Sequence, residues 1–64
     1  MSGQIPVEVC HHETEALLGT VTVASVTEVS RLRVAAVAGR KLPVVDHGVD
    51  HRHDPPRCFL WVKP

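Results

Sequence analysis

The chain has 64 residues, which allows one small domain over residues 1–64 and leaves little room for a hydrophobic core. A catalytic pocket would take core volume that so short a chain lacks, and the known nucleophile and phosphate-binding motifs are absent, so we do not expect an enzyme. Seven basic and seven acidic residues give a formal net charge of zero, whereas dedicated nucleic-acid-binding proteins normally carry a basic excess.

The apolar residues favour strands over helices. The chain contains twelve valines but only one Phe, one Trp and no Tyr. Valine loses side-chain freedom in a helix and packs well on a pleated sheet. We therefore expect a core of small branched side chains held in a sheet.

Residues 4–12 alternate between apolar and polar positions, which predicts a strand with one buried face. Ile5, Val7 and Val9 would share that face. Pro6 has no N–H to donate to a neighbouring strand, so we expect this strand at an edge of the sheet.

The polar residues 11–15 predict a turn, and a second strand follows over residues 18–24. Val21 and Val23 would point inward, with Thr20 and Thr22 on the opposite face. The alternation is lost after Val23, which indicates a bulge or the end of the strand.

Residues 25–38 fit two structures. As a strand, Leu32, Val34 and Ala36 share a face, and Gly39-Arg40 would form the two-residue turn of a hairpin. As a helix over 26–38, Ser25 and Glu28 would form a capping box, but β-branched residues crowd its first turn. We favour strands and keep the helix as the alternative.

The last third of the chain combines a short strand, a loop and a final strand. Pro43 limits the strand over residues 41–45, and residues 46–57, rich in His, Asp and Pro, predict a loop. The apolar run over residues 58–62 holds both aromatic residues and predicts a central strand that buries them in the core. The fold is thus expected to be mostly β, an antiparallel sheet or barrel of four or five strands, with an α+β fold as the alternative.

Five residues form a candidate zinc site, because zinc prefers four sulfur or nitrogen ligands: Cys10, His12, His51, His53 and Cys58. Four of them, Cys10, His12, His53 and Cys58, could converge if the first and last strands pair, and Asp46 and Asp50 could orient imidazole rings. Their spacing matches no familiar zinc motif, so two buried thiols and a solvated loop, with no cofactor, remain the alternative. A Cys10–Cys58 disulfide would require an oxidising compartment.

One basic cluster is a candidate partner-binding site: Arg31, Arg33, Arg40 and Lys41. On a hairpin, the first two would share the face away from the core and the last two would lie at its tip. Such a face suits a protein partner or, less well given the net charge, nucleic acid; otherwise it is a solvated charged face.

The predicted function is binding, without catalysis, to another protein. The expected edge strand, the absence of net charge and a surplus of valines (Val26, Val29, Val37 and Val49) favour a protein partner or a homo-oligomer. We expect an inhibitor, adaptor or assembly subunit, of a size that suits a bacterial or phage accessory protein. The alternative is a zinc-stabilised nucleic-acid-binding module. The sequence contains no signal peptide or membrane-spanning stretch, so we expect a cytoplasmic location.

Overall fold

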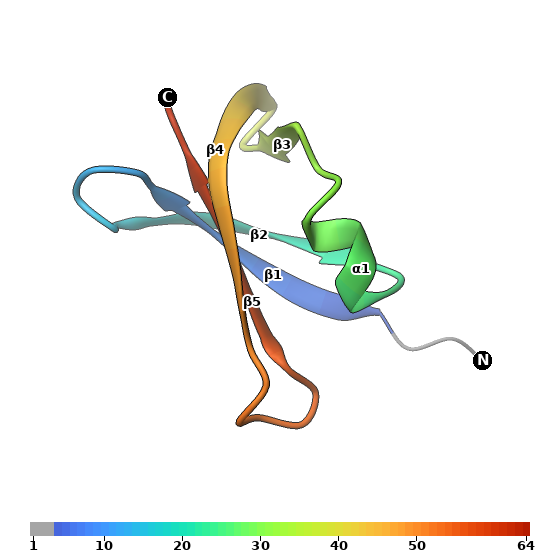
Figure 1. Cartoon of the computed structure of the whole chain (residues 1–64). Helices are drawn as coiled ribbons and strands as arrows, with labels where there is room; N and C mark the ends of the chain where they lie inside the picture. The colour runs from blue at the N-terminus through green and yellow to red at the C-terminus, as the bar shows by residue number, and fades with distance from the viewer. Residues whose placement is uncertain (1–3) are drawn as a thin grey trace.

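The computed structural model describes residues 4–64, which form five strands and one short helix (Figure 1). In chain order these are β1 (Ile5–His11), β2 (Leu17–Val23), α1 (Val26–Val29), β3 (Val34–Val37), β4 (Arg40–Asp50) and β5 (Arg57–Val62). The prediction of a mostly β protein is confirmed.

The strands form one mixed sheet in the order β2-β1-β5-β4-β3. Neighbouring strands are antiparallel except β1 and β5, which pair in parallel at the centre of the sheet. The sheet curls until its two edge strands, β2 and β3, contact each other through Gly19 and Val37. The result is a nearly closed barrel, with α1 following the end of β2 (Figure 1).

β1 is an inner strand, so the prediction that Pro6 places it at an edge is wrong. β1 lies between β2 and β5. Its pairing with β5 begins at Val7, opposite Cys58, and Pro6 is paired only with Thr22 of β2. The proline therefore lies just before the segment that has neighbours on both sides, where its missing N–H interrupts no bond to β5.

The core consists almost entirely of small aliphatic side chains. Its buried members are Val7, Val9, Val23, Val29, Ala35, Val37, Leu42, Cys58, Leu60 and Val62. Each fully buried valine or leucine contributes about 1.5–3 kcal/mol. Val29 and Val37, expected to be surplus to one core, are inside it, and Val49 packs against it. The valines that are left exposed are instead Val34 and Val45, whereas Val26 is half-buried.

Residues 25–38 divide between the two predicted structures. α1 is a single turn in which the carboxylate of Glu28 accepts a hydrogen bond from the N–H of Ala24 at 3.0 Å. The helix ends at Val29 and the chain becomes extended from Val34, but the predicted inward face is reversed: Ala35 and Val37 are buried, whereas Val34 and Ala36 are exposed. The helical prediction thus holds for one turn only, and the predicted capping box is absent, because the side chain of Ser25 makes no cap hydrogen bond and Glu28 accepts from Ala24 rather than from Ser25. In the described part of the chain, no helix is long and apolar enough to cross a bilayer.

The β3–β4 hairpin turns at Ala38 and Gly39, one residue earlier than predicted. Their φ angles are +52° and +74°, as the two-residue turns that suit the twist of a hairpin require. Arg40, expected in the turn, is the first residue of β4 and pairs with Val37.

β4 is longer than the predicted strand over 41–45, because it continues through Asp50 as the partner of β5. The connection to β5 therefore comprises residues 51–56, where a loop over 46–57 was predicted. Pro43 is tolerated within β4, where it pairs with Val34 of the edge strand β3. The register shifts between Val44 and Asp46, which leaves the extra residue, Val45, 53% exposed.

Candidate functional site

Both aromatic residues of the chain lie on the outer face of the barrel, contrary to the prediction that they are buried in the core. Along β5, Cys58, Leu60 and Val62 point inward and are buried. Phe59 and Trp61 alternate with them and are only half-buried. Their rings stack with centroids 5.9 Å apart and planes 26° apart. The core thus uses no aromatic side chain, and the aromatic surface is left facing outward.

The position of Trp61 depends on a glycine in the neighbouring strand. A Cβ atom at Gly48 of β4 would lie 3.1 and 3.2 Å from two atoms of the six-membered ring of the indole. A larger residue there would push the ring away from the sheet. Gly48 therefore lets the indole rest on the backbone of β4.

Apolar side chains from the neighbouring strands extend this aromatic pair. Cys10 of β1 is paired with Trp61, and Leu17 of β2 is paired with Cys10. Leu17 and Val45 are 59% and 53% exposed, which makes them two of the three large apolar residues that are exposed in the described chain. We call these five residues the Trp61 patch: Cys10, Leu17, Val45, Phe59 and Trp61.

Two open hollows adjoin the indole of Trp61. The first, of about 430 Å³, is lined by His12, Glu15, Val45, Asp46 and Trp61. The second, of about 380 Å³, is lined by Glu8, Cys10, Glu15, Leu17, Phe59 and Trp61. Trp61 and Glu15 line both, so the two hollows are neighbours on the same part of the surface.

Three carboxylate side chains line the hollows beside the patch: Glu8, Glu15 and Asp46. Glu8 accepts a hydrogen bond from Arg57 Nη2 at 2.8 Å, and the Arg57 guanidinium carbon lies 5.3 Å from the centroid of the Phe59 ring. Within residues 4–64, no lysine or arginine forms an ion pair with Glu15 or Asp46. The hollow beside Trp61 therefore has two carboxylates whose charge is not neutralised by a neighbouring cation.

The environment of Cys10 keeps its thiol protonated. Partial burial raises the pKa of Cys10, and the negative charges of Glu8 and Glu15 raise it further. Burial alone raises the pKa of Cys58, whose side chain faces the core. Since the thiolate is the nucleophile, neither cysteine has an environment that suits catalysis.

The structure does not bring the two predicted cysteine ligands together. The first and last strands do pair, but they run in parallel, with Val7 opposite Cys58 and Cys10 opposite Trp61. Residues three apart on a strand face opposite sides of it, so Cys58 points into the core and Cys10 points out. Both cysteines are free, and this arrangement does not bring them together as the candidate Cys10–Cys58 disulfide would require.

The three histidines of the predicted zinc site are also separated. The N–H of His12 donates to Val62 O, at the end of β5, whereas His51 and His53 lie in the loop before β5 begins. The length of β5 thus separates the two groups. Across residues 4–64, no group of three or more His, Cys, Asp or Glu side chains is arranged to hold a metal ion.

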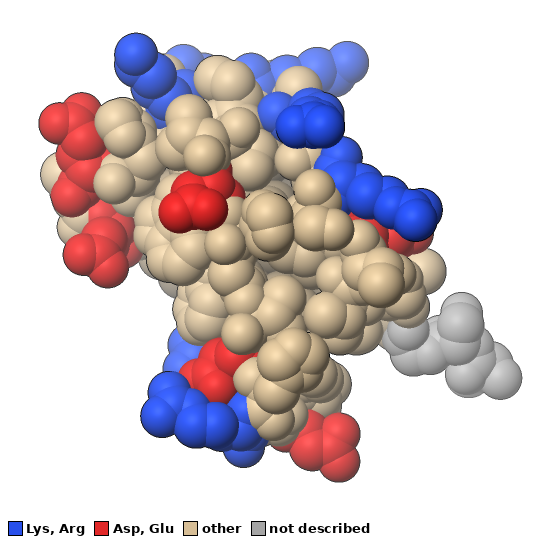
Figure 2. Space-filling model, in the orientation of Figure 1, with Lys and Arg blue, Asp and Glu red and all other residues tan. Residues whose placement is uncertain are grey.

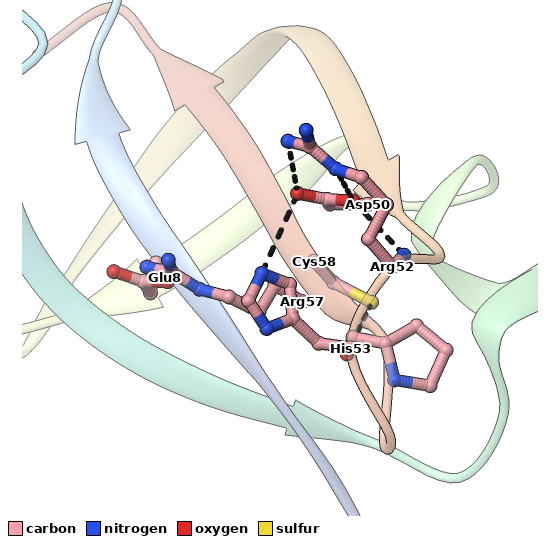
Figure 3. Close-up of polar contacts among 7 residues, drawn as sticks. Glu8, Asp50, Arg52, His53, Arg57 and Cys58 are labelled. Atoms are coloured by element: carbon pink, nitrogen blue, oxygen red, sulfur yellow. Dashed lines mark hydrogen bonds and ion pairs between the residues drawn. The ribbon is translucent and has the colours of Figure 1, made fainter.

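The His/Asp-rich loop makes its own polar contacts (Figure 3). Asp50 accepts hydrogen bonds from the N–H and the guanidinium of Arg52 at 2.9–3.0 Å, and its carboxylate lies 3.6 Å from Nε2 of His53. The side-chain hydrogen bonds from Arg52 are the main cause of a lowered pKa of Asp50. Asp50 was predicted to orient a metal-bound histidine. In the structure it instead links the end of β4 to Arg52 and His53 of the loop.

The predicted basic cluster is exposed but is not one face of a hairpin. Arg31 and Arg33 lie between α1 and β3, and Arg40 and Lys41 follow the hairpin turn. Figure 2 shows basic side chains along the top of the molecule, where β3 and β4 meet, and acidic ones at the left, over the β1–β2 loop. The Trp61 patch is bordered by acidic residues, so the predicted cations do not join it.

Sequence reasoning missed the patch for an identifiable reason. The segment Cys58-Phe59-Leu60-Trp61-Val62 is apolar throughout, so its alternation between two faces is invisible in the pattern. The outward positions of Phe59 and Trp61 become visible only in the structure, where the pairing with β1 places them beside Glu8 and Cys10.

Comparisons with known proteins give no independent assignment. No protein family model matches the chain, and neither the curated proteins nor the solved structures include a significant match. The functional conclusion therefore depends on the geometry of the Trp61 patch.

Proposed function

We propose that the chain is a non-catalytic protein-binding protein that docks its partner on the Trp61 patch, as an inhibitor, adaptor or assembly subunit does. The observation that carries the proposal is the position of Trp61 and Phe59. In a chain this short of large core residues, both aromatic rings face outward and are stacked beside exposed Leu17 and Val45. Clusters of this kind are typical of the energetic centres of protein interfaces.

The charges around the patch specify the chemistry of the partner. Glu8, Glu15 and Asp46 line the hollows, and of these only Glu8 has a cationic partner within residues 4–64. A partner surface that is apolar at its centre and carries positively charged side chains would be complementary. We therefore propose a protein with such a surface as the occupant.

The same charges argue against a nucleic-acid-binding role. Proteins that bind single strands stack bases on aromatic rings within a positively charged groove. Here the aromatic rings are framed by carboxylates, which repel phosphate, and Arg31, Arg33, Arg40 and Lys41 lie outside the patch.

The partner is best found through the patch itself. A photo-crosslinking amino acid at position 17, in cells that produce the chain naturally, should yield one defined conjugate that mass spectrometry identifies. The same amino acid at position 34 is the control, because Val34 is the exposed apolar residue outside the patch. The partner is then purified and its affinity measured by calorimetry.

Three variants test the proposal. Leu17→Lys and Val45→Lys place a charge in the patch and should weaken binding of the identified partner about tenfold or more, whereas Val34→Lys should leave it unchanged. All three positions are exposed, so the fold should tolerate the change. Equal effects at Val45 and Val34, or a partner that crosslinks only from position 34, would refute the proposal.

A further inference from the structure

We infer that the hollow between Glu15, Asp46 and Trp61 receives an arginine side chain of the partner. This inference rests on the proposed function and adds to it the chemical group that is recognised. It follows from comparing the surroundings of the two aromatic residues on the outer face of β5.

The chain already binds an arginine of its own beside the first of these residues. The guanidinium of Arg57 lies over the ring of Phe59, 5.3 Å from its centroid, and donates to the carboxylate of Glu8 at 2.8 Å. Glu8 is the direct register partner of Phe59 across the β1–β5 pair. An aromatic ring, a carboxylate on the adjacent strand and an arginine thus form one unit on this face (Figure 3 shows its arginine and carboxylate).

The second aromatic residue, Trp61, also has carboxylates beside it, but they come from β4 and from the β1–β2 loop. Asp46 is the register partner of Trp61 across the β4–β5 pair, and Glu15 lines the same hollow from the β1–β2 loop. Within residues 4–64, no lysine or arginine pairs with either carboxylate. The hollow is thus lined by two carboxylates, the indole and His12, and no arginine or lysine of the described chain lines it.

Arginine suits this hollow better than lysine does. Its guanidinium group is planar, stacks on aromatic rings and presents several donors, so it can contact the indole and two carboxylates together. The hollow's volume of about 430 Å³ is within the range of small-ligand sites. Val45 at its border would contact the aliphatic part of the arginine side chain.

Titration with short peptides tests the inference without the natural partner. Trp61 is the single tryptophan and the chain has no tyrosine, so its fluorescence reports directly on the hollow. The probe is the blocked pentapeptide Gly-Leu-Arg-Leu-Gly. Its control has citrulline in place of arginine, which keeps the shape of the side chain but removes its charge.

We expect a saturable change in fluorescence with the arginine peptide at low millimolar concentration, and a dissociation constant about tenfold higher with the citrulline peptide. Glu15→Gln and Asp46→Asn should each weaken arginine binding about threefold or more, and added salt should reduce it. Asn at position 46 can still accept the hydrogen bond from the N–H of His47, so the backbone is preserved. Asp54→Asn, in the β4–β5 loop, is the matched control and should have no effect.

The outcomes separate this inference from the proposed function. Equal affinity for both peptides, no arginine-dependent change up to about 10 mM, or an equal effect of Asp54→Asn overturns the arginine site. If the partner then still depends on Leu17 and Val45, the docking proposal stands alone. If the partner depends on neither the apolar nor the acidic positions, both fail.

Discussion

Gly19 of β2 and Val37 of β3 meet where the two edge strands of the barrel approach each other without hydrogen-bonding. A Cβ atom on Gly19 would lie 2.5 Å from Cγ1 of Val37, closer than two carbon atoms can approach. Val37 is buried in the core, so its methyl group cannot simply move into solvent. A side chain at position 19 would therefore require Val37 to change its conformation within the core or the two edge strands to shift, and glycine avoids both.

Gly19→Ala should destabilise the protein by about 1–3 kcal/mol, the usual cost of overpacking a core. The measurement is chemical denaturation of the variant, with Thr20→Ala, whose side chain is exposed, as the control. In a double-mutant cycle with Val37→Ala, the two substitutions should be strongly non-additive, because the second removes the atom that the first contacts. Additive effects would contradict the steric explanation.

Ala38→Gly should stabilise the hairpin between β3 and β4. Ala38 has a φ angle of +52°, a conformation that alanine adopts at a cost and glycine adopts freely. We expect a gain of about 0.5–1 kcal/mol in the free energy of unfolding, measured by thermal and chemical denaturation. Ala36→Gly, in the extended part of β3, should instead lower stability, and a gain there would show that the turn is not the cause.

Glu15→Gln should make Cys10 more reactive toward iodoacetamide. The pKa of Cys10 is raised by burial and by the charges of Glu8 and Glu15, so removing one charge lowers the pKa and increases the thiolate fraction at pH 8. A rise of about twofold in the alkylation rate is expected at low salt, and it should shrink at high salt. Peptide mapping by mass spectrometry distinguishes Cys10 from the buried Cys58. An unchanged rate at low salt would contradict the electrostatic effect.

Asp50→Asn should lower stability at neutral pH and have a smaller effect in acid. Hydrogen bonds from Arg52 lower the pKa of Asp50 in the folded state relative to its ordinary value of 3.8. A lowered folded-state pKa stabilises the fold above that ordinary value, and this stabilisation is lost as the pH falls below it. Melting temperatures of the variant and the original chain should therefore converge in acid. In an Arg52→Ala background, where the donor is absent, the pH-dependent difference should disappear.

The sequence predicted β1 and β2, where apolar and polar residues alternate regularly. Val7 and Val9 in β1 and Val23 in β2 face inward as their spacing indicated. The pattern could not show that β1 is an inner strand, because the effect of Pro6 depends on where the pairing with β5 begins. Nor could local propensity decide residues 25–38, where a single helical turn and a strand follow each other within one connection.

The Trp61 patch could not be predicted from the sequence, because it depends on β1 and β5 running in parallel. Cys10 and Cys58 seemed able to meet once the first and last strands paired, but the parallel register places them on opposite faces. The same register places Cys10 beside Trp61 and so creates the Trp61 patch. Sequence spacing gives neither the direction nor the register of strands that lie nearly 50 residues apart.

The parallel pairing of β1 and β5 also has a consequence for how the protein is made. These two strands are paired inside the sheet, yet among its five strands β1 is synthesised first and β5 last. Until β5 emerges, β1 lacks one of its two neighbours and the core lacks Leu60 and Val62. The nascent chain therefore cannot complete its barrel before β5 has been synthesised, and until then its valine-rich hairpins lack part of the core that covers them.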